Sequence, residues 1–172
     1  MTVVVRMIDA LSARDRGLYS RWALHEGSAQ AVRRCWIGVT HAGGAAATIT
    51  AAVVPIALQL RGGRASWLAA GSLVLSHLVV QAIKRTVGRP RPEAPAGIAA
   101  PDRFSFPSGH ATASMAVALC YAVAVPTIAL PLVGFGLLVG WSRVVLGVHY
   151  PGDVVAGQLI AVLTVLALRP LA

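Results

Sequence analysis

The hydrophobic pattern of this chain breaks in two short stretches, and each stretch holds cations and at least one histidine. Ionisable groups are costly near a bilayer, so a concentrated set of them indicates a site. Three cations, two histidines and one carboxylate suit phosphoryl transfer, because that reaction depends mainly on positioning and on stabilising negative charge. The candidate residues are Lys84, Arg91, Ser108, Gly109, His110, Arg143, His149 and Asp153.

His149 and Asp153 have the spacing of a nucleophile and its orienting group. Between them lies Tyr150-Pro151-Gly152, and proline suits the first turn of a helix because its missing N–H costs nothing there. The Asp153 carboxylate can then fold back onto one imidazole nitrogen, which fixes the tautomer and leaves the other nitrogen nucleophilic. The alternative interpretation is a helix-capping aspartate beside an interfacial histidine.

The run Pro107-Ser108-Gly109-His110 opens an apolar stretch and is a candidate anion site. Ser108 suits a helix N-cap, and the free N–H groups and dipole of a helix start attract anions. Gly109 lets an oxyanion approach the backbone, and His110 in the same turn is placed to donate a proton. Such a triplet is weak evidence by itself.

Lys84 and Arg91 are placed to hold one dianion, because Lys84 ends an apolar stretch and Arg91 follows beyond Gly88. Arg143 ends another such stretch and is the third candidate cation. Snorkelling at the membrane boundary is an equally good interpretation of Lys84 taken alone. His77 lies two helical turns before Lys84, and we favour a hydrogen-bonded core histidine over a pocket residue there.

The elements that position these residues are apolar helices. The chain has 172 residues, of which 56% are hydrophobic and 12% charged, roughly half the charged fraction of a soluble domain. A bilayer core needs about 20 helical residues. The prediction is an all-α integral membrane bundle of about five transmembrane helices. The apolar stretches are Trp36–Leu60, Ser66–Val87, Ser108–Val125, Thr127–Trp141 and Pro151–Leu168.

Residues 1–35 are predicted to form an amphipathic helical arm on the membrane surface. Apolar Leu18 and Trp22 alternate with Arg14, Arg16 and Arg21, as in helices that lie in the interface. A solvated charged tail is the alternative. The expected organisation is therefore an N-terminal arm of residues 1–35 and one transmembrane domain of residues 36–172.

Five spans place the arm, the loop 88–107 and the loop 142–150 at the same membrane face. Lys and Arg are concentrated there: twelve of the fifteen lie on this side, and only Arg61, Arg64 and Arg169 lie on the other. The positive-inside rule then predicts that the site faces the cytoplasm from the inner (plasma) membrane.

Charge and ligand patterns restrict the partners. The net charge is +9, but no exposed element alternates basic and aromatic residues, so anionic lipid and phosphate are expected rather than nucleic acid. No carboxylate cluster suits Mg²⁺, and the two cysteines lack zinc-ligand spacing. No metal and no other cofactor are expected. The oligomeric state is left open.

Three motifs in order resemble the type 2 phosphatidic acid phosphatase superfamily. They are K-x6-RP at residues 84–92, PSGH at 107–110 and SR-x5-H-x3-D at 142–153. The resemblance covers about residues 84–153. Members of that superfamily commonly show six spans, whereas this chain shows five and an arm.

The resemblance implies metal-independent hydrolysis of a lipid phosphate. His149 would attack phosphorus and form a phosphohistidine, Asp153 would orient it, and His110 would protonate the leaving oxygen. A vanadate-dependent haloperoxidase uses a similar set of residues, but on a large soluble protein. A non-enzymatic transport or lipid-binding protein would not need the full set. The implied phosphate ligands are Lys84, Arg91, Ser108, Gly109 and Arg143.

The expected substrate carries its phosphate on a lipid whose chain stays in the bilayer, and we favour a prenyl-linked one. The leading specific expectation is decaprenylphosphoryl-5-phosphoribose, whose 5-phosphate is removed during synthesis of cell-wall arabinan. Undecaprenyl diphosphate, phosphatidylglycerophosphate and phosphatidic acid remain alternatives.

Overall fold

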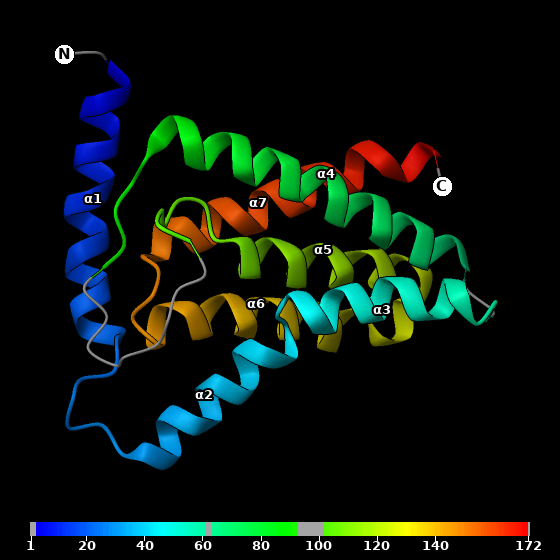
Figure 1. Ribbon diagram of the computed structural model, residues 1–172, viewed down its shortest axis with the longest axis horizontal. Helices are drawn as coiled ribbons and strands as arrows, with labels where there is room; N and C mark the ends of the chain where they lie inside the picture. Colours follow the sequence, from blue (N-terminus) through cyan, green and yellow to red (C-terminus); the bar gives the residue numbers. More distant parts are fainter. Residues whose placement is uncertain (1–2, 61–62, 93–101, 172) are drawn as a thin grey trace.

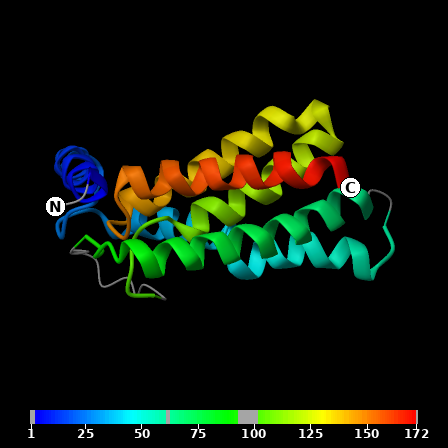
Figure 2. The same ribbon diagram turned by 90° about the horizontal axis from the view of Figure 1, so that it is seen from above.

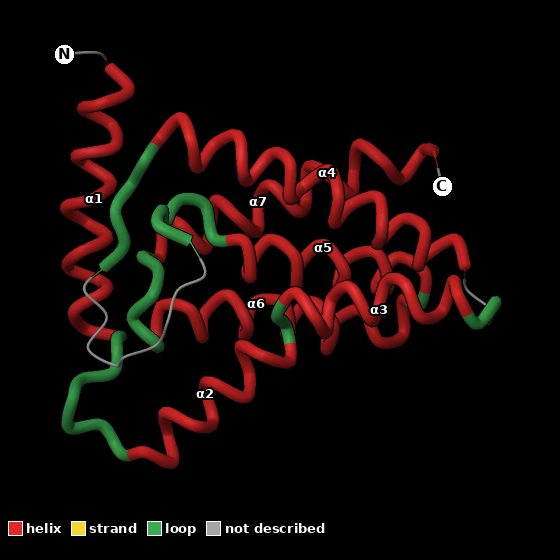
Figure 3. The backbone as a smooth tube through the Cα atoms, viewed as in Figure 1, coloured by secondary structure: helices red, strands yellow, loops and turns green. Residues whose placement is uncertain are grey.

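The computed structural model describes residues 3–60, 63–92 and 102–171, and this part of the chain is helical without β-strands (Figures 1 and 3). Its only β-pairing is an isolated bridge between Pro90 and Phe104. The helices are α1 (Val3–Trp22), α2 (Gln30–Ala42), α3 (Ala45–Ala57), α4 (Gly63–Val87), α5 (Gly109–Ala124), α6 (Ala129–Val145) and α7 (Pro151–Leu168), with short 3-10 turns at Pro126–Ile128 and Arg169–Leu171.

The bundle is built around α5, which packs against α3, α4, α6 and α7. Successive helices from α4 to α7 run in alternating directions (Figures 1 and 2). Among the residues that the structure describes, four helical segments are long and apolar enough to cross a membrane, and α5 is a shorter apolar helix. The predicted all-α membrane bundle is therefore confirmed. The four segments are Gln30–Ala57, Gly63–Val87, Pro126–Val145 and Pro151–Leu171.

The first span is broken, whereas the sequence predicted one continuous stretch over Trp36–Leu60. It begins earlier, at Gln30, and α2 and α3 meet at Gly43 and Gly44. A Cβ on Gly43 would lie 2.4 Å from Val139 of α6, so only glycine permits this approach. Gly44 is extended (φ −75°, ψ 179°), which ends the helical path. The predicted boundary at residue 35 lies within α2.

Pro55 lies inside α3 and leaves a backbone acceptor free, because proline has no N–H to donate to the carbonyl four residues earlier. That carbonyl belongs to Ala51, and the hydroxyl of Tyr121 on α5 donates to it at 2.6 Å. Ser66 of α4 lies 2.9 Å from the same hydroxyl. Tyr121 thus connects α3, α4 and α5 where Pro55 interrupts the hydrogen bonds of α3.

Small residues bring the helices close together, as expected for packing inside the bundle. A Cβ on Gly136 would lie 3.2 Å from the backbone of Met115 in α5. A Cβ on Gly157 of α7 would lie 2.6 Å from the carbonyl oxygen of Ser108, just before α5 begins. Gly157 therefore lets the start of α5 lie directly against α7.

The arm helix α1 crosses one end of the bundle instead of running along it (Figures 1 and 2). Trp22 packs on Trp141 of α6 with ring centroids 4.7 Å apart. Just after α1, the N–H of Leu24 donates to the carbonyl of Val145 at 2.8 Å.

Candidate active site

Four helix ends meet beside α1, at the end of the bundle that α1 crosses. The last turns of α4 and α6 and the first turns of α5 and α7 all lie at this end of the bundle (Figure 1). His110 lies in the first turn of α5, and His149 lies just before α7. The structure thus gathers all eight predicted site residues at one end.

His149 is a buried imidazole with one defined tautomer. Its Nε2 lies 3.0 Å from Nη1 of Arg91, and a guanidinium can only donate hydrogen bonds, so Nε2 is the acceptor. The proton is then on Nδ1, which lies 3.5 Å from Oδ2 of Asp153. Burial lowers the pKa of His149 to about 4, although the Asp153 carboxylate raises it in part. The imidazole is therefore neutral at pH 7.

Asp153 caps the start of α7, and the same carboxylate faces the buried His149. Its Oδ2 accepts the backbone N–H of Tyr150 at 2.9 Å and faces His149. Its Oδ1 accepts a hydrogen bond from Nη1 of Arg89 at 2.6 Å. Its backbone carbonyl accepts the N–H of Ser108 at 2.9 Å, which links the second motif to the third.

Lys84 and Arg91 share one counter-ion, Asp102. Nζ of Lys84 lies 3.3 Å from Oδ1 of Asp102 and donates to the carbonyl of Phe104 at 2.7 Å. Arg91 donates through Nη2 to the same Oδ1 and through Nη1 to the carbonyl of Val148. Lys84 is buried, so it does not snorkel to the surface.

The carboxylate of Asp102 remains charged in this setting. Burial raises its pKa, but the hydrogen bond from Arg91 and the charge of Lys84 outweigh burial and lower the pKa below its usual value. An anion thus already lies between two of the predicted phosphate-binding cations, which shows that their positions suit negative charge.

Arg143 and Ser108 keep free donors in the buried site. Nη1 of Arg143 donates to Oγ1 of Thr40 on α2 at 2.7 Å. Nε of Arg143 and the hydroxyl of Ser108 are buried and have no hydrogen-bond partner among the residues that the structure describes. Ser108 occupies the N-cap position of α5 as predicted, but its side chain makes no capping bond. These unused donors suit an incoming anion.

Gly109 and His110 complete the first turn of α5. Apart from its own chain neighbours and helix backbone, no atom of the described residues lies within 4 Å of a Cβ built on Gly109, so space is open beside it. A Cβ on Gly44 would lie 3.5 Å from Nε2 of His110. The break between α2 and α3 therefore forms a wall beside His110.

Besides Asp102, three residues with contacts in this site were not among the predicted site residues. Thr40 holds Arg143, Arg89 holds Asp153, and Asp15 of α1 lies 2.9 Å from Nη2 of Arg89. Arg89 had a weak signal, because it lies two residues before Arg91 in an extended segment. Thr40 and Asp15 lie outside the motifs, and no sequence pattern pairs them with the site.

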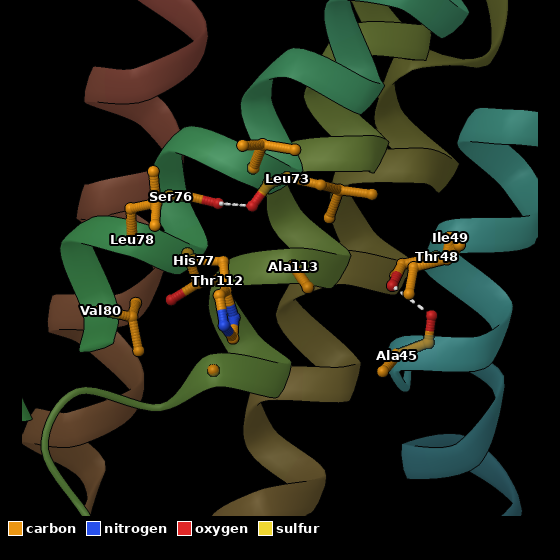
Figure 4. Close-up of a pocket in the computed structure, with 12 residues that line it drawn as sticks. Ala45, Thr48, Ile49, Leu73, Ser76, His77, Leu78, Val80, Thr112 and Ala113 are labelled. Carbon is orange, nitrogen blue, oxygen red and sulfur yellow. Dashed lines mark hydrogen bonds between the residues drawn. The ribbon is translucent and has the colours of Figure 1, made fainter.

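An apolar groove of about 390 Å³ runs from the first turn of α5 between α3 and α4 (Figure 4). Gly109 and Thr112 line its end at the site, and Ile49, Val74 and Leu78 line its apolar walls. His77 also lines this groove and is exposed, so its interpretation as a core histidine was wrong.

The donor set of the site suits anions rather than metal ions. Across residues 3–60, 63–92 and 102–171, no group of three or more His, Cys, Asp or Glu is placed to hold a metal. The site carboxylates of Asp15, Asp102 and Asp153 each pair with Lys or Arg.

Comparison with known proteins gives both sequence and structural relatives. The PAP2 superfamily matches residues 65–171. A decaprenylphosphoryl-5-phosphoribose phosphatase of Mycolicibacterium smegmatis is 46% identical over 100 residues, which cover 55% of this chain and 53% of that protein. One of the same name from Mycobacterium tuberculosis H37Rv is 39% identical over 117 residues, covering 63% and 62%.

The structural similarity extends over nearly the whole chain. The crystal structure of a PAP2-type phosphatidylglycerolphosphate phosphatase from Bacillus subtilis superposes with a TM-score of 0.78 at 23% identity, covering 94% of this chain and 86% of that one. At this identity the match shows a shared fold. The chain spans between half and two thirds of the length of the mycobacterial relatives.

Proposed function

This chain belongs to the PAP2 superfamily, and on that premise we propose that it hydrolyses a phosphate ester on a membrane lipid through a phosphohistidine at His149. The observation that carries this proposal is the state of His149: a buried, neutral imidazole whose Nε2 lone pair points at a cation of the site. A neutral imidazole among cations is suited to attack an anionic phosphoryl group.

In the first step, Nε2 of His149 attacks phosphorus in line, and the bond from phosphorus to the lipid oxygen breaks. The leaving oxygen takes a proton from His110, which enters this step as an imidazolium and leaves it neutral, and the Nδ1–H of His149 stays directed at Asp153. In the second step, water attacks phosphorus and gives its proton to His110, which breaks the P–N bond. Inorganic phosphate leaves and both histidines return to their starting states.

The phosphoryl oxygens would be held by Lys84, Arg91 and Arg143, with the hydroxyl of Ser108 and the N–H of Gly109. The free Nε of Arg143 and free hydroxyl of Ser108 support this assignment. Because three cations and a helix start supply the charge that the reaction needs, we propose that hydrolysis is independent of metal. Full activity in EDTA is expected, and a loss that Mg²⁺ restores would contradict the proposal.

We propose that the substrate is a prenyl-linked lipid phosphate, with decaprenylphosphoryl-5-phosphoribose as the first choice and cell-wall arabinan synthesis as its setting. The names of the two mycobacterial relatives support that choice. The groove beside Gly109 supports a lipid whose chain lies between α3 and α4 while its phosphate meets His149. Undecaprenyl diphosphate, phosphatidylglycerophosphate and phosphatidic acid are the alternatives to compare.

We propose that the site faces the cytoplasm from the inner membrane, and that the arm of residues 1–35 and the membrane domain of residues 36–172 act as one unit. The excess of Lys and Arg at the site end supports this orientation. Asp102→Cys, made in a Cys35→Ala background because Cys35 is exposed, tests it. Labelling by an impermeant thiol reagent in intact cells would place the site outside.

The central experiment is phosphate release from a panel of purified lipid phosphates in detergent, with and without EDTA. His149→Ala should abolish release, and His25→Ala, which changes an exposed histidine in the loop after α1, should not. Acid quenching of the wild type with ³²P-labelled substrate should trap an acid-labile phosphoenzyme that His149→Ala lacks. Hydrolysis retained in His149→Ala, or no hydrolysis of any lipid phosphate by the wild type, would refute the proposal.

A further inference from the structure

We propose that Asp15, on the N-terminal arm, is a positioning residue of the active site and acts through Arg89 on the Asp153 carboxylate. This inference rests on the proposed function, because it assigns Asp15 a part in orienting His149. Two side-chain contacts separate Asp15 from Asp153, and neither Asp15 nor Arg89 belongs to the residues that the motifs assign.

The contacts form one continuous buried chain. Oδ2 of Asp15 lies 2.9 Å from Nη2 of Arg89, and Nη1 of Arg89 lies 2.6 Å from Oδ1 of Asp153. Oδ2 of Asp153 then faces Nδ1 of His149. Their exposed fractions are 6% for Asp15, 8% for Arg89, 0% for Asp153 and 2% for His149. Pairs this deeply buried are weakly screened by water, so each charge acts strongly on the next.

The guanidinium of Arg89 has a fixed geometry because three groups hold it. Nη1 donates a hydrogen bond to Asp153, Nη2 forms an ion pair with Asp15 that lacks hydrogen-bond geometry, and the ring of Tyr150 lies 4.2 Å from Cζ. Tyr19 of α1 packs edge-on against Tyr150 at 5.6 Å between centroids. An arginine held at both Nη atoms presents its fork in one orientation, which sets where the Asp153 carboxylate lies.

Asp15 also holds the start of α7 directly. Its Oδ1 accepts the N–H of Gly152 at 3.0 Å, and a carboxylate is favourable at a helix N-terminus. A Cβ on Gly152 would lie 2.6 Å from Oδ2 of Asp15, so a glycine is needed for this approach. Asp15 of the arm therefore contacts both Gly152, the residue before Asp153, and Arg89, the ion-pair partner of Asp153.

Substitutions that remove a charge from Asp15 or from Arg89 should shift the pKa of His149 in opposite directions. The charged groups that act on His149 are Arg91 beyond α4, Arg143 on α6 and Asp153 on α7, and the titratable His110 faces it from α5. Removing the negative charge of Asp15 leaves Arg89 less compensated and makes protonation of His149 harder. Removing the positive charge of Arg89 makes it easier.

The test compares Asp15→Asn and Arg89→Gln with Arg16→Gln, an exposed neighbour on α1. Phosphate release is measured against pH with one substrate, so the ionisation of the substrate is common to all variants. We expect both variants to lower kcat by about tenfold or more, because Arg89→Gln removes the charge-assisted hydrogen bond to Asp153 and Asp15→Asn removes the buried ion pair with Arg89. The acid limb of kcat/KM should move to lower pH in Asp15→Asn and to higher pH in Arg89→Gln.

Gly152→Ala provides a second test that keeps every charge. It displaces the Asp15 carboxylate from Arg89 by sterics, so it should lower kcat and move the acid limb in the same direction as Asp15→Asn, by a smaller amount. The inference would be overturned if Asp15→Asn kept the wild-type kcat and the wild-type acid limb. It would also be overturned if the acid limbs of Asp15→Asn and Arg89→Gln moved in the same direction. If His149→Ala is inactive while Asp15→Asn behaves as Arg16→Gln does, only this inference fails. If His149→Ala is active, the proposed function itself fails.

Discussion

The imidazole of His149 is neutral because it is buried, and this state predicts an acid limit for activity. Burial lowers its pKa from 6.5 to about 4, and only the neutral form has the Nε2 lone pair. Above about pH 4 the nucleophile is available, and kcat/KM should fall as pH drops through that value. The check is kcat/KM from pH 3 to 8, with the ionisation of the substrate measured separately. If the acid limb of the kcat/KM profile that belongs to the enzyme lies near pH 6.5, burial does not lower the pKa of His149 as argued.

The hydroxyl of Ser108 allows function to be separated from stability. It is buried and has no partner among the described residues, so Ser108→Ala removes no hydrogen bond from the resting site. We expect unfolding temperature to stay at the wild-type value while kcat/KM falls about tenfold, equivalent to about 1.4 kcal/mol. Ser72→Ala, which changes a buried serine of α4, is the control. A stability loss with unchanged kcat/KM would assign Ser108 to the fold instead.

Some residues of the site could be predicted from the sequence and others could not. Lys84, His110 and His149 lie in breaks of the hydrophobic pattern, where their cost in a membrane makes them visible in the sequence. Thr40 resembles any other small polar residue of a membrane helix, and Asp15 resembles any other charge of an amphipathic arm. Their roles depend on contacts across long separations in the chain, which periodicity does not encode.

The proline of α3 gives a prediction at the level of the helix. Tyr121 on α5 donates to the carbonyl of Ala51, which Pro55 leaves without its usual donor. Tyr121→Phe should lower the free energy of unfolding by about 1–3 kcal/mol, the cost of an unsatisfied buried acceptor. In a Pro55→Ala background the helix supplies its own N–H, so the same substitution should cost less.

Unfolding by SDS titration in mixed micelles measures this double-mutant cycle. The loss of the contact with Ser66 is common to both backgrounds and cancels. An equal cost of Tyr121→Phe with and without Pro55 would show that the hydroxyl does not compensate for the proline.

Helix positions were largely predictable because a bilayer requires long apolar helices. The last predicted stretch, Pro151–Leu168, coincides with α7, since a proline starts it and apolar residues continue to its end. The break at Gly43 and Gly44 was not predictable, because Gly-rich packing and a broken helix share one sequence pattern. It depends on Val139 of α6 occupying the space beside Gly43.

Across the whole molecule, two membrane crossings separate the arm from the loop after α4, and two more separate that loop from the loop after α6, so all three lie at one face. That argument required only the span count, and it placed the arm at the same end as the loops after α4 and α6. The contact of α1 with α7 could not be deduced from the span count, because the pairing of Asp15 with Arg89 and Gly152 is a tertiary contact.

The groove between α3 and α4 has a kinetic consequence for assays. Its walls include Ile49, Val74 and Leu78, which are 54%, 63% and 61% exposed on the apolar flank of the bundle. On the proposed function, a lipid would enter this groove sideways from the bilayer without passing through water. The velocity should therefore follow the mole fraction of substrate in mixed micelles. Doubling the detergent at fixed substrate should slow turnover below saturation, and doubling both together should leave turnover per enzyme unchanged.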